Sequence, residues 1–352
     1  MRYWRIANSD GKVWLLPRRN TRVALALYQP SGWKGKTLKM LLPLLSVLPE
    51  AFAPFAVQEW EVDDSIREIL EQIFKGRKLE WAVFEGTPSV HQKLVLQVYC
   101  GQEILAYCKI SAKTDIISLF TQEAELLQEL GLKGIDSIPR CLYVGPTGNE
   151  NEQMLVLSTE KTTASEVPHE WNDLQQSFME DLQAKTARMI PFEECDLASA
   201  IEILRDRVDV LPECVDKTSW ESALNYVKNR CRGKMMNCAV GHGDFTPWNM
   251  FVEHGRLFVF DWEYAYRCCP VGLDRYHFLV QTAFFERHWS AEQLMALAST
   301  QDGAWIEIDH LIYYLILVLS RFVGREPADK KMSDTSLIAF WNQLIILCLK
   351  TK

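Results

Sequence analysis

The chain has 352 residues, of which 48% are hydrophobic and 24% charged, as in ordinary globular proteins. This composition excludes disordered, collagen-like and small disulfide-rich proteins, and the length predicts about two domains. The 46 acidic and 38 basic residues give a net charge of -8, so no positive surplus is available to hold a nucleic acid. The ten cysteines include no Cys-x-x-Cys pair, which argues against a zinc ribbon and favours reduced thiols in a cytoplasmic protein.

Residues 1–78 differ in pattern from the rest and are expected to form an α/β extension of unknown role. They contain a predicted hairpin over 3–16, a β-rich apolar run over 22–28, and a helix over about 36–48 that carries Lys36 and Lys39. A basic amphipathic helix can touch a membrane surface, although packing against a neighbouring part of the chain explains the same pattern. No apolar run reaches the ~20 residues of a membrane span, and the start does not read as a secretory signal.

The remaining sequence changes pattern twice. Residues 79–158 predict a compact α+β lobe, with strands at 81–84, 94–99, 103–110, 141–144 and 154–158 and a helix at about 115–130. Residues 159–352 are mainly helical, with helices predicted at 170–187, 197–210, 220–229, 273–285, 306–323 and 337–349. Two short strands and a turn interrupt this helical part at 239–261. Irregular segments on a rigid scaffold often carry function, so the chemistry is sought there.

The interruption contains two carboxylates and one amide beside apolar runs. Asp244 and Asn249 lie in the string VGHGDFTPWN, and Asp261 begins the string DWE after the next strand. Phosphoryl transfer needs such a set: one carboxylate to orient and deprotonate the attacking hydroxyl, and a carboxylate and an amide to hold Mg²⁺. On this division of labour Asp244 is the base, whereas Asn249 and Asp261 are the metal ligands. A single Asp or Asn in a loop is more often a turn former.

These strings resemble a known family. HGDFTPWN resembles the HGDxxPxN catalytic loop of aminoglycoside phosphotransferases and the related choline and ethanolamine kinases, and DWEYA resembles their magnesium-binding segment, closest to the choline kinase branch. The resemblance implies a bilobal, protein-kinase-like α+β fold: a small antiparallel N-lobe with one helix over 79–158, a larger helical C-lobe over 159–352, and the extension. It also implies that His242 supports the loop. Asp274 is expected to cap the following helix.

A kinase-like first lobe must also supply a lysine for the phosphates and a helix glutamate to hold that lysine. Strand alternation puts Tyr107 and Lys109 on one face. In the predicted helix, Glu123 lies on the same stripe as Phe120 and Leu127. A glutamate that points inward needs a cationic partner, so an ion pair between Lys109 and Glu123 is predicted. The alternative is a partly exposed Glu123 at the edge of the stripe.

The nucleotide contacts are harder to predict. Tyr107 can stack on the adenine ring or be an ordinary core tyrosine. The segment between the first two strands of the lobe is either a phosphate-covering loop or a plain hairpin turn, with backbone N–H groups of Thr87 and Ser89 facing phosphate in the first case. Its only glycine is Gly86. The strand end that contains Val156 and Ser158 is expected to read the adenine edge through its backbone.

The resulting prediction is an ATP- and Mg²⁺-dependent kinase of a small hydroxyl compound, such as an aminoglycoside, an amino-alcohol or a sugar. Aromatic and acidic residues of the later helices suit a cationic acceptor, although most of them are better explained as core or solvated surface residues. The alternatives are a catalytically silent kinase-like binding or scaffold protein and, with less support, a protein kinase, because no long activation segment follows Asp261. GTP use, the acceptor and the oligomeric state stay open.

Overall fold

The structure is a computed structural model that describes residues 1–352 except 9–10, 29–32, 46–54, 87–91, 208–209 and 326–334. The chain forms two compact units, which are described separately. Unit 1 contains Met1–Pro168 and Met250–Glu263, and unit 2 contains His169–Asn249 and Tyr264–Lys352. Within the described ranges, no helix is both long enough and apolar enough to cross a membrane.

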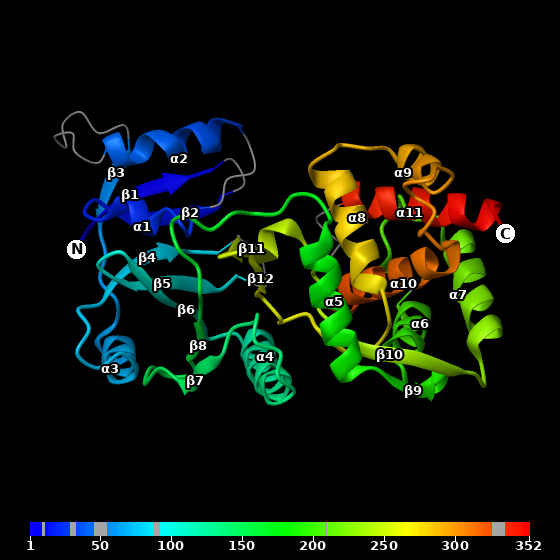
Figure 1. Ribbon diagram of the computed structural model, residues 1–352, viewed down its shortest axis with the longest axis horizontal. Helices are drawn as coiled ribbons and strands as arrows, with labels where there is room; N and C mark the ends of the chain where they lie inside the picture. Colours follow the sequence, from blue (N-terminus) through cyan, green and yellow to red (C-terminus); the bar gives the residue numbers. More distant parts are fainter. Residues whose placement is uncertain (9–10, 29–32, 46–54, 87–91, 208–209, 326–334) are drawn as a thin grey trace. The chain divides into compact units, whose positions relative to one another are not determined.

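Unit 1 is built on one antiparallel sheet of eight strands in the order β3-β1-β2-β4-β5-β6-β8-β7 (Figure 1). The strands are β1 (Arg2–Ala7), β2 (Val13–Pro17), β3 (Ala56–Glu59), β4 (Glu80–Phe84), β5 (Leu94–Cys100), β6 (Glu103–Ser111), β7 (Cys141–Pro146) and β8 (Gln153–Ser158). The predicted first hairpin and all five predicted strands of 79–158 are confirmed. The first 78 residues are continuous with this sheet, because β2 pairs with β4 at Trp14↔Phe84 and Leu15↔Val83.

Alternation along the strands gives the sheet two apolar faces. On one face Leu15, Val83 and Ala106 pack with Ile66 and Leu70 of α3 (Asp64–Ile73). On the other face Trp14, Leu16 and Ala82 pack with α1 (Thr21–Ala24) and α2 (Trp33–Leu45). Helix α4 (Thr114–Leu132) confirms the predicted helix of this lobe, and the hairpin of β11 (Met250–Glu253) and β12 (Arg256–Val259) completes the unit.

The structure of the first 78 residues differs from the prediction at 22–28 and shifts the predicted helix. The β-rich run 22–28 was expected to be extended, and this prediction is wrong: it begins with helix α1, which follows Asn20 in the left-handed region at φ 59°. The Thr21 hydroxyl donates to the carbonyl of Pro17 at 3.0 Å and turns the chain there. Helix α2 confirms the predicted helix, displaced by a few residues; the predicted end, residues 46–48, lies outside the described residues.

Unit 2 is mainly helical, as predicted. Its α-helices are α5 (Asp173–Thr186), α6 (Asp196–Asp206), α7 (Lys217–Cys231), α8 (Leu273–Phe285), α9 (Ala291–Leu297), α10 (Ile308–Arg325) and α11 (Thr335–Lys350). A three-stranded sheet in the order β13-β10-β9 joins them, formed by β9 (Arg188–Pro191), β10 (Met235–Gly241) and β13 (Tyr266–Pro270). The sequence did not predict β9, β13 or α9. Large apolar side chains from α10 and α11, such as Leu315 and Trp341, fill the core.

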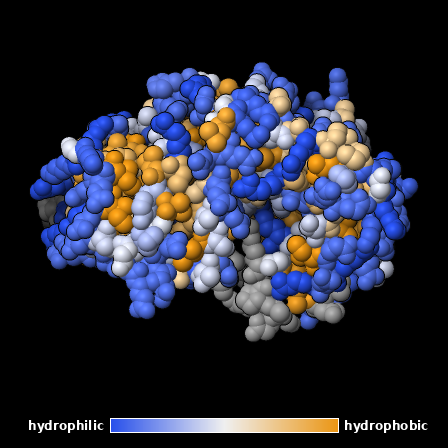
Figure 2. Space-filling model, turned by 90° about the horizontal axis from the view of Figure 1, so that it is seen from below, coloured by the Kyte–Doolittle hydropathy of each residue, from blue (hydrophilic) through white to orange (hydrophobic). Residues whose placement is uncertain are grey.

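Among the described residues, exposed large apolar side chains are spread over both units. Exposed large apolar side chains include Met40 and Leu132 in unit 1 and Met189 and Met235 in unit 2. The face drawn in Figure 2 shows apolar atoms in several separate places among polar ones. Scattered apolar residues of this kind are normal for a globular protein.

Candidate functional site

The predicted ion pair of unit 1 is present. Lys109 lies on β6, and its Nζ is 2.7 Å from Oε2 of Glu123 on α4. Both residues are buried, and Glu123 is 0% exposed. The apolar stripe of α4 places Glu123 inward, as its spacing from Phe120 and Leu127 predicted, and all three are buried. The ammonium of Lys109 is therefore fixed at one place beside the sheet.

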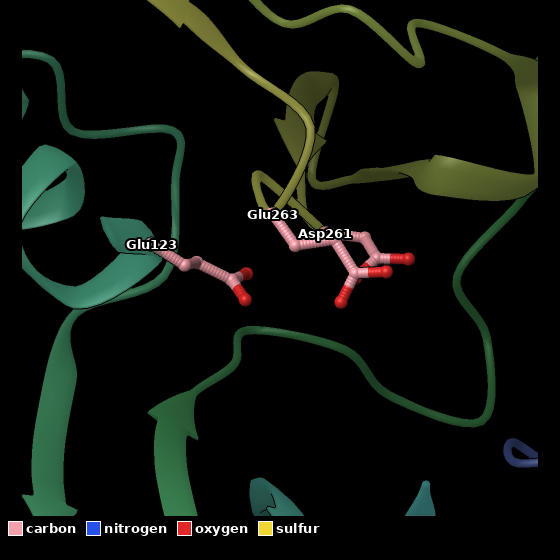
Figure 3. Close-up of side chains that lie close together, drawn as sticks. All are labelled: Glu123, Asp261 and Glu263. Carbon is pink, nitrogen blue, oxygen red and sulfur yellow. The ribbon is translucent and has the colours of Figure 1, made fainter. Parts of the chain in front are cut away.

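Two further carboxylates converge on the same lysine. Asp261 and Glu263 follow β12, and their carboxylates approach that of Glu123 from the opposite side (Figure 3). The Lys109 Nζ is 2.5 Å from Asp261 Oδ1 and 3.4 Å from Glu263 Oε2. Lys93, just before β5, also pairs with Glu263 and lies 4.0 Å from Asp261. Three carboxylates thus face two ammonium groups, which leaves a negative excess.

Burial and the neighbouring carboxylates shift the pKa of Lys109 in opposite directions. Burial alone would lower the pKa of Lys109, but the carboxylates of Asp261, Glu123 and Glu263 outweigh it and hold that pKa well above its ordinary value. The pKa of Glu123 is raised, first by burial and then by the two neighbouring carboxylates, and Lys109 offsets only part of this rise. The lysine is therefore a permanent cation, whereas the acidic groups are crowded.

The backbone around Asp261 is strained and anchored. Asp261 has φ 68°, in the left-handed region that non-glycine residues rarely adopt. The next residue, the buried Trp262, donates its N–H to Glu123 Oε1 at 3.1 Å and its indole N–H to Val259 O at 3.0 Å. Strained backbone that is held by its surroundings is typical of functional sites.

The predicted nucleotide contacts fall in different environments. Gly86 has φ 80°, and a Cβ there would lie 2.4 Å from the carbonyl oxygen of Lys93, so only glycine fits this turn. Thr87 and Ser89 lie outside the described residues. Val156 is paired with β6 and β7 inside the sheet. Ser158 donates its N–H to Arg140 O at 2.9 Å, so these two backbones already have partners within the fold.

Tyr107 lies on the same side of β6 as Lys109, as predicted. The alternate residues Ala106 and Cys108 belong to the core on the other face. The Tyr107 ring packs against a small buried cluster formed by Val23, Ala26, Tyr99 and Ile104, and its hydroxyl donates to Gln97 Oε1 at 3.3 Å. In this structure its ring is therefore covered by the chain itself.

In unit 2 the structure brings Asp244 and Asn249 together. The Asn249 Nδ2 donates to Asp244 Oδ2 at 2.7 Å and to the Asp244 carbonyl at 2.9 Å. The second carboxylate oxygen, Oδ1, lies 2.9 Å from Nε2 of His277 on α8. The amide orientation leaves Asn249 Oδ1 as the atom that can hold a cation.

The carboxylate of Asp274 holds the loop that carries Asp244. It accepts the N–H of His242 at 2.7 Å and of Gly243 at 2.9 Å. Asp274 lies in the first turn of α8 and has a structural role, as expected, but its carboxylate binds the loop N–H groups and does not cap the helix, whose N-cap is Gly272. His242 supports the loop as expected, because its Nδ1 accepts the N–H of Asp244 at 3.2 Å.

Gly243 and Arg321 complete this support. Gly243 has φ 76°, and a Cβ there would lie 2.2 Å from the carbonyl oxygen of Tyr264, so a side chain cannot be accommodated. The buried guanidinium of Arg321 on α10 donates to the Gly243 carbonyl, and its Cζ lies 5.2 Å from the ring centre of Tyr264. The loop is thus held on both sides by residues distant in sequence.

The surroundings of Asp244 favour its ionised form. Burial would raise the pKa of this carboxyl, but the hydrogen bond from His277 and the charges of His277, Arg321 and His242 lower it to about 2. Sequence reasoning missed His277 and Arg321, and it missed Lys93 and Glu263 in unit 1. Glu263 had a signal, because it belongs to the same DWE string as Asp261.

The aromatic residues suggested for the acceptor are mostly structural. Tyr313 and Tyr314 are buried on α10, and Trp341 is buried in the helical core. The Trp305 ring is covered by the guanidinium of Arg275, with 3.8 Å between Cζ and the ring centre. These placements agree with the core interpretation.

No protein-family model and no curated protein matches this sequence. Among solved structures, an apo thermostable mutant of the aminoglycoside phosphotransferase APH(4)-Ia has 16% identity and a TM-score of 0.52, over 81% of this chain and 98% of that one. The same enzyme in a ternary complex with ADP and hygromycin B has 15% identity and a TM-score of 0.51, over 82% and 99%. A fructosamine-3-kinase from Haemophilus somnus has 14% identity over 81% and 97%, with a TM-score of 0.46.

These likenesses concern the fold. The chain has the protein-kinase-like fold of the aminoglycoside phosphotransferases, and the predicted fold class is confirmed. Within unit 1, Lys109 pairs with a helix glutamate and with a carboxylate after β12.

Proposed function

We propose that the protein transfers the γ-phosphate of Mg²⁺-ATP to a hydroxyl group of a small molecule of the aminoglycoside, amino-alcohol or sugar type. The observation that carries this proposal is the Lys109 ammonium, buried among Glu123, Asp261 and Glu263. Buried charges are costly to keep, so such clusters are concentrated at functional sites. The kinase-like fold supports the same function.

In this proposal the unit 1 cluster receives the phosphates. Lys109 binds phosphate oxygens and Glu123 holds the lysine in place. The tight turn at Gly86 allows backbone to approach a phosphate closely, because no Cβ intervenes. Thr87, Ser89 and the backbone beyond Ser158 stay proposed nucleotide contacts, with the base on the Tyr107 side of the sheet.

Asp244 is the proposed base. It accepts the proton of the acceptor hydroxyl while that oxygen forms a bond to the γ-phosphorus, and the bond from the γ-phosphorus to the bridging oxygen breaks to release ADP. The bonds from Asn249 and His277 fix the rotamer of Asp244. Each carboxylate oxygen can accept a second hydrogen bond, so an acceptor hydroxyl has a place to bind.

The residues present fit a hard divalent cation. Asn249 offers an amide oxygen, Asp261 a carboxylate, and Glu263 a second carboxylate from the same segment, which are the ligand types that Mg²⁺ prefers. When bound, Mg²⁺ neutralises phosphate charge. We propose Asn249 and Asp261 as its ligands. Lys93 and Lys109 neutralise only part of the acidic charge, and the remaining negative charge favours a cation.

The test is an ATP-consumption screen with Mg²⁺ over amino-alcohols, aminoglycosides and monosaccharides. We expect turnover with at least one class and a loss of about 10²- to 10⁴-fold in Asp244→Asn, because one general base is removed. Asp196→Asn is the control, since Asp196 is a unit 2 aspartate to which the proposal gives no role; its carboxylate accepts the N–H of Cys268 at 2.7 Å.

The outcomes separate the candidate functions. Binding of Mg²⁺-ATP by calorimetry without turnover of any acceptor would favour the silent kinase-like protein. Phosphorylation of a protein substrate in preference to every small molecule would favour a protein kinase. Absence of both turnover and nucleotide binding would contradict the kinase proposal.

A further inference from the structure

The side of the unit 1 sheet beside Lys109 carries polar and aromatic groups that the catalytic roles above do not use. Gln97 on β5 faces Tyr107 on β6 in register, two residues along the strand from Lys109. Gln97 is 0% exposed. A buried amide needs hydrogen-bond partners. The group that pairs with the Gln97 amide therefore indicates which chemical groups this surface accepts.

That partner is the chain itself. The Gln97 Nε2 donates to the carbonyl of Val23 at 2.9 Å, a contact that spans 74 residues of sequence. Val23 and Ala26 form a buried cluster with Tyr99 and Ile104, and Tyr107 packs against it. Residues 20–28, which contain α1, therefore cover the face on which Tyr107 was predicted to meet an adenine ring.

A second donor on this surface makes the same kind of contact. Lys161, three residues after the end of β8, donates from Nζ to the carbonyl of Ala26 at 3.2 Å. The ammonium lies 5.9 Å and 5.8 Å from the ring centres of Phe251 and Phe260. Phe260 immediately precedes Asp261, so this position adjoins the phosphate cluster. Burial, and then the charge of Lys39, lower the pKa of Lys161 to about 7.

We propose that this surface, lined by Gln97, Tyr107 and Lys161, is the binding site for the purine base of the nucleotide, and that residues 20–28 occupy it when no nucleotide is bound. The inference rests on the proposed function and adds to it. Aromatic walls with a few convergent donors are typical of base pockets. Two peptide carbonyls fill the place of the acceptor atoms that a purine edge presents.

The consequence is a competition between the segment and the nucleotide. A nucleotide that places its base beside Lys109 must displace residues 20–28, and its measured affinity is reduced by the occupancy of the covered state. Once residues 20–28 are displaced, Gln97 and Lys161 can donate hydrogen bonds to ring nitrogen or carbonyl acceptors of the base. The segment is attached at its start by Asn20, whose Nδ2 donates to the Glu80 carboxylate at 3.0 and 3.1 Å.

The first test is hydrogen exchange of the full chain with and without saturating Mg²⁺-AMP-PNP. We expect the amides of residues 21–28 to exchange faster when the nucleotide is bound, because their burial is lost. Helix α3 is the internal reference, since Ile66 and Leu70 pack on the opposite face of the sheet and the proposal requires no change there. Nucleotide binding that leaves residues 21–28 as protected as before, or more protected, would overturn the inference while the proposed function stands.

The second test loosens the segment without touching the base surface. Asn20→Gly removes the bonds to Glu80 and keeps the left-handed backbone. Asn151→Gly is the matched control, because Asn151 has the same φ of 59° in the β7–β8 turn. We expect Asn20→Gly to bind Mg²⁺-AMP-PNP about threefold more tightly than wild type, in proportion to one exposed hydrogen bond, and Asn151→Gly to bind as wild type does.

The remaining outcomes are also decisive. Binding by Asn20→Gly but not by the wild type supports the inference strongly. Equal affinities of Asn20→Gly, Asn151→Gly and wild type contradict it. If neither the wild type nor Asn20→Gly binds Mg²⁺-AMP-PNP or Mg²⁺-GMP-PNP by calorimetry, both the inference and the proposed function fail.

Discussion

Two lysines of unit 1 are shielded from solvent, Lys109 fully and Lys161 in part, yet their surroundings act on them in opposite ways. Lys109 is paired with Glu123 and Asp261 at 2.7 and 2.5 Å. Lys161 faces the Phe251 and Phe260 rings and one peptide carbonyl. The pKa of Lys109 is held well above its ordinary value by the carboxylates despite burial, whereas burial lowers the pKa of Lys161 to about 7.

The difference shows that burial does not decide the charge of a lysine; the number of carboxylates around it does. Lys109 stays protonated and in a fixed position, so it can bind an anionic ligand. Lys161 is held by weaker partners, rings and a carbonyl, which a ligand with similar groups can replace. Substitutions at Lys109, Lys161, Asp244 and Glu263 test this comparison.

Lys109→Met should have the largest effect. It leaves three carboxylates facing Lys93 alone, and removing one partner of a buried ion pair typically costs about 3–5 kcal/mol. We expect the free energy of unfolding in urea at pH 7 to fall by that amount. Adding Glu123→Gln should restore part of the loss, because it removes an uncompensated charge and keeps an acceptor for the Trp262 N–H.

Lys93→Met is the matched control for Lys109→Met. Lys93 belongs to the same cluster, but its side chain is 17% exposed against 9% for Lys109. Its loss should therefore cost less than that of Lys109. Equal losses in the two variants, or no recovery in the double variant, would mean that the carboxylates do not single out Lys109.

Lys161→Met should change the free energy of unfolding in the opposite direction and stabilise the protein. Because the pKa of Lys161 is lowered to about 7 in the folded protein, the unfolded chain binds more protons between pH 7 and about 10.5, and wild-type stability rises through that window. Below pH 7 the cost of the buried ammonium is fully present. We expect Lys161→Met to be more stable than wild type by about 2–4 kcal/mol at pH 6, and this gain to vanish near pH 10.

Urea unfolding at pH 6, 8 and 10 measures this prediction. Lys133→Met, a substitution of an exposed lysine after α4, controls for the general effect of removing a positive charge. A gain that is independent of pH would show that Lys161→Met acts through packing, and a loss at pH 6 would show that Lys161 is a favourable cation like Lys109.

Asp244→Asn tests the same principle on a buried acid, and we expect it to lower the free energy of unfolding by about 2 kcal/mol. The pKa of Asp244 is lowered to about 2, so its stabilising contribution is fully present above about pH 4 and is lost as the pH falls towards 2. Asp244→Asn should be less stable than wild type at pH 6, and the difference should shrink below pH 4. Thermal unfolding of both proteins in the same buffers tests this; a difference that stays constant down to pH 3 contradicts it.

The parts of this molecule that sequence alone could predict are those with local causes. The stripe spacing of α4 predicted that Glu123 faces inward, and the ion pair with Lys109 follows from it. The string that contains Asp244 and Asn249 places both residues in one loop, and the structure shows their side chains within hydrogen-bond distance. In both cases a period or a short string fixes the geometry, because the residues belong to one element or one loop.

The missed parts depend on contacts between distant residues. His277 and Arg321 reach the Asp244 loop across 33 and 78 residues of sequence, and no local pattern marks them. The pairing of β2 with β4, which makes the first 78 residues continuous with the sheet, is also non-local. The run 22–28 has strand-like composition, but the left-handed Asn20 and the Thr21 hydroxyl bond begin a helix there, because tertiary context overrides propensity.

Glu263→Gln should have the smallest effect on stability, and it sharpens the account of Lys109. Lys109 keeps two closer carboxylates when Glu263 is neutral, and removing one of three like charges relieves repulsion with Asp261 and Glu123. We therefore expect the free energy of unfolding to fall by only about 1 kcal/mol, as for one charged hydrogen bond partly offset.

Metal binding separates the two roles open to Glu263. If it is a ligand, Glu263→Gln weakens Mg²⁺ binding in the presence of ADP, measured by calorimetry, by about tenfold or more. Glu123→Gln, which alters the same cluster from the α4 side, is the matched control and should weaken it less. Equal Mg²⁺ affinity in wild type and Glu263→Gln would assign Glu263 to holding Lys93 and Lys109 alone, because Asp261 is then sufficient as the carboxylate ligand of unit 1.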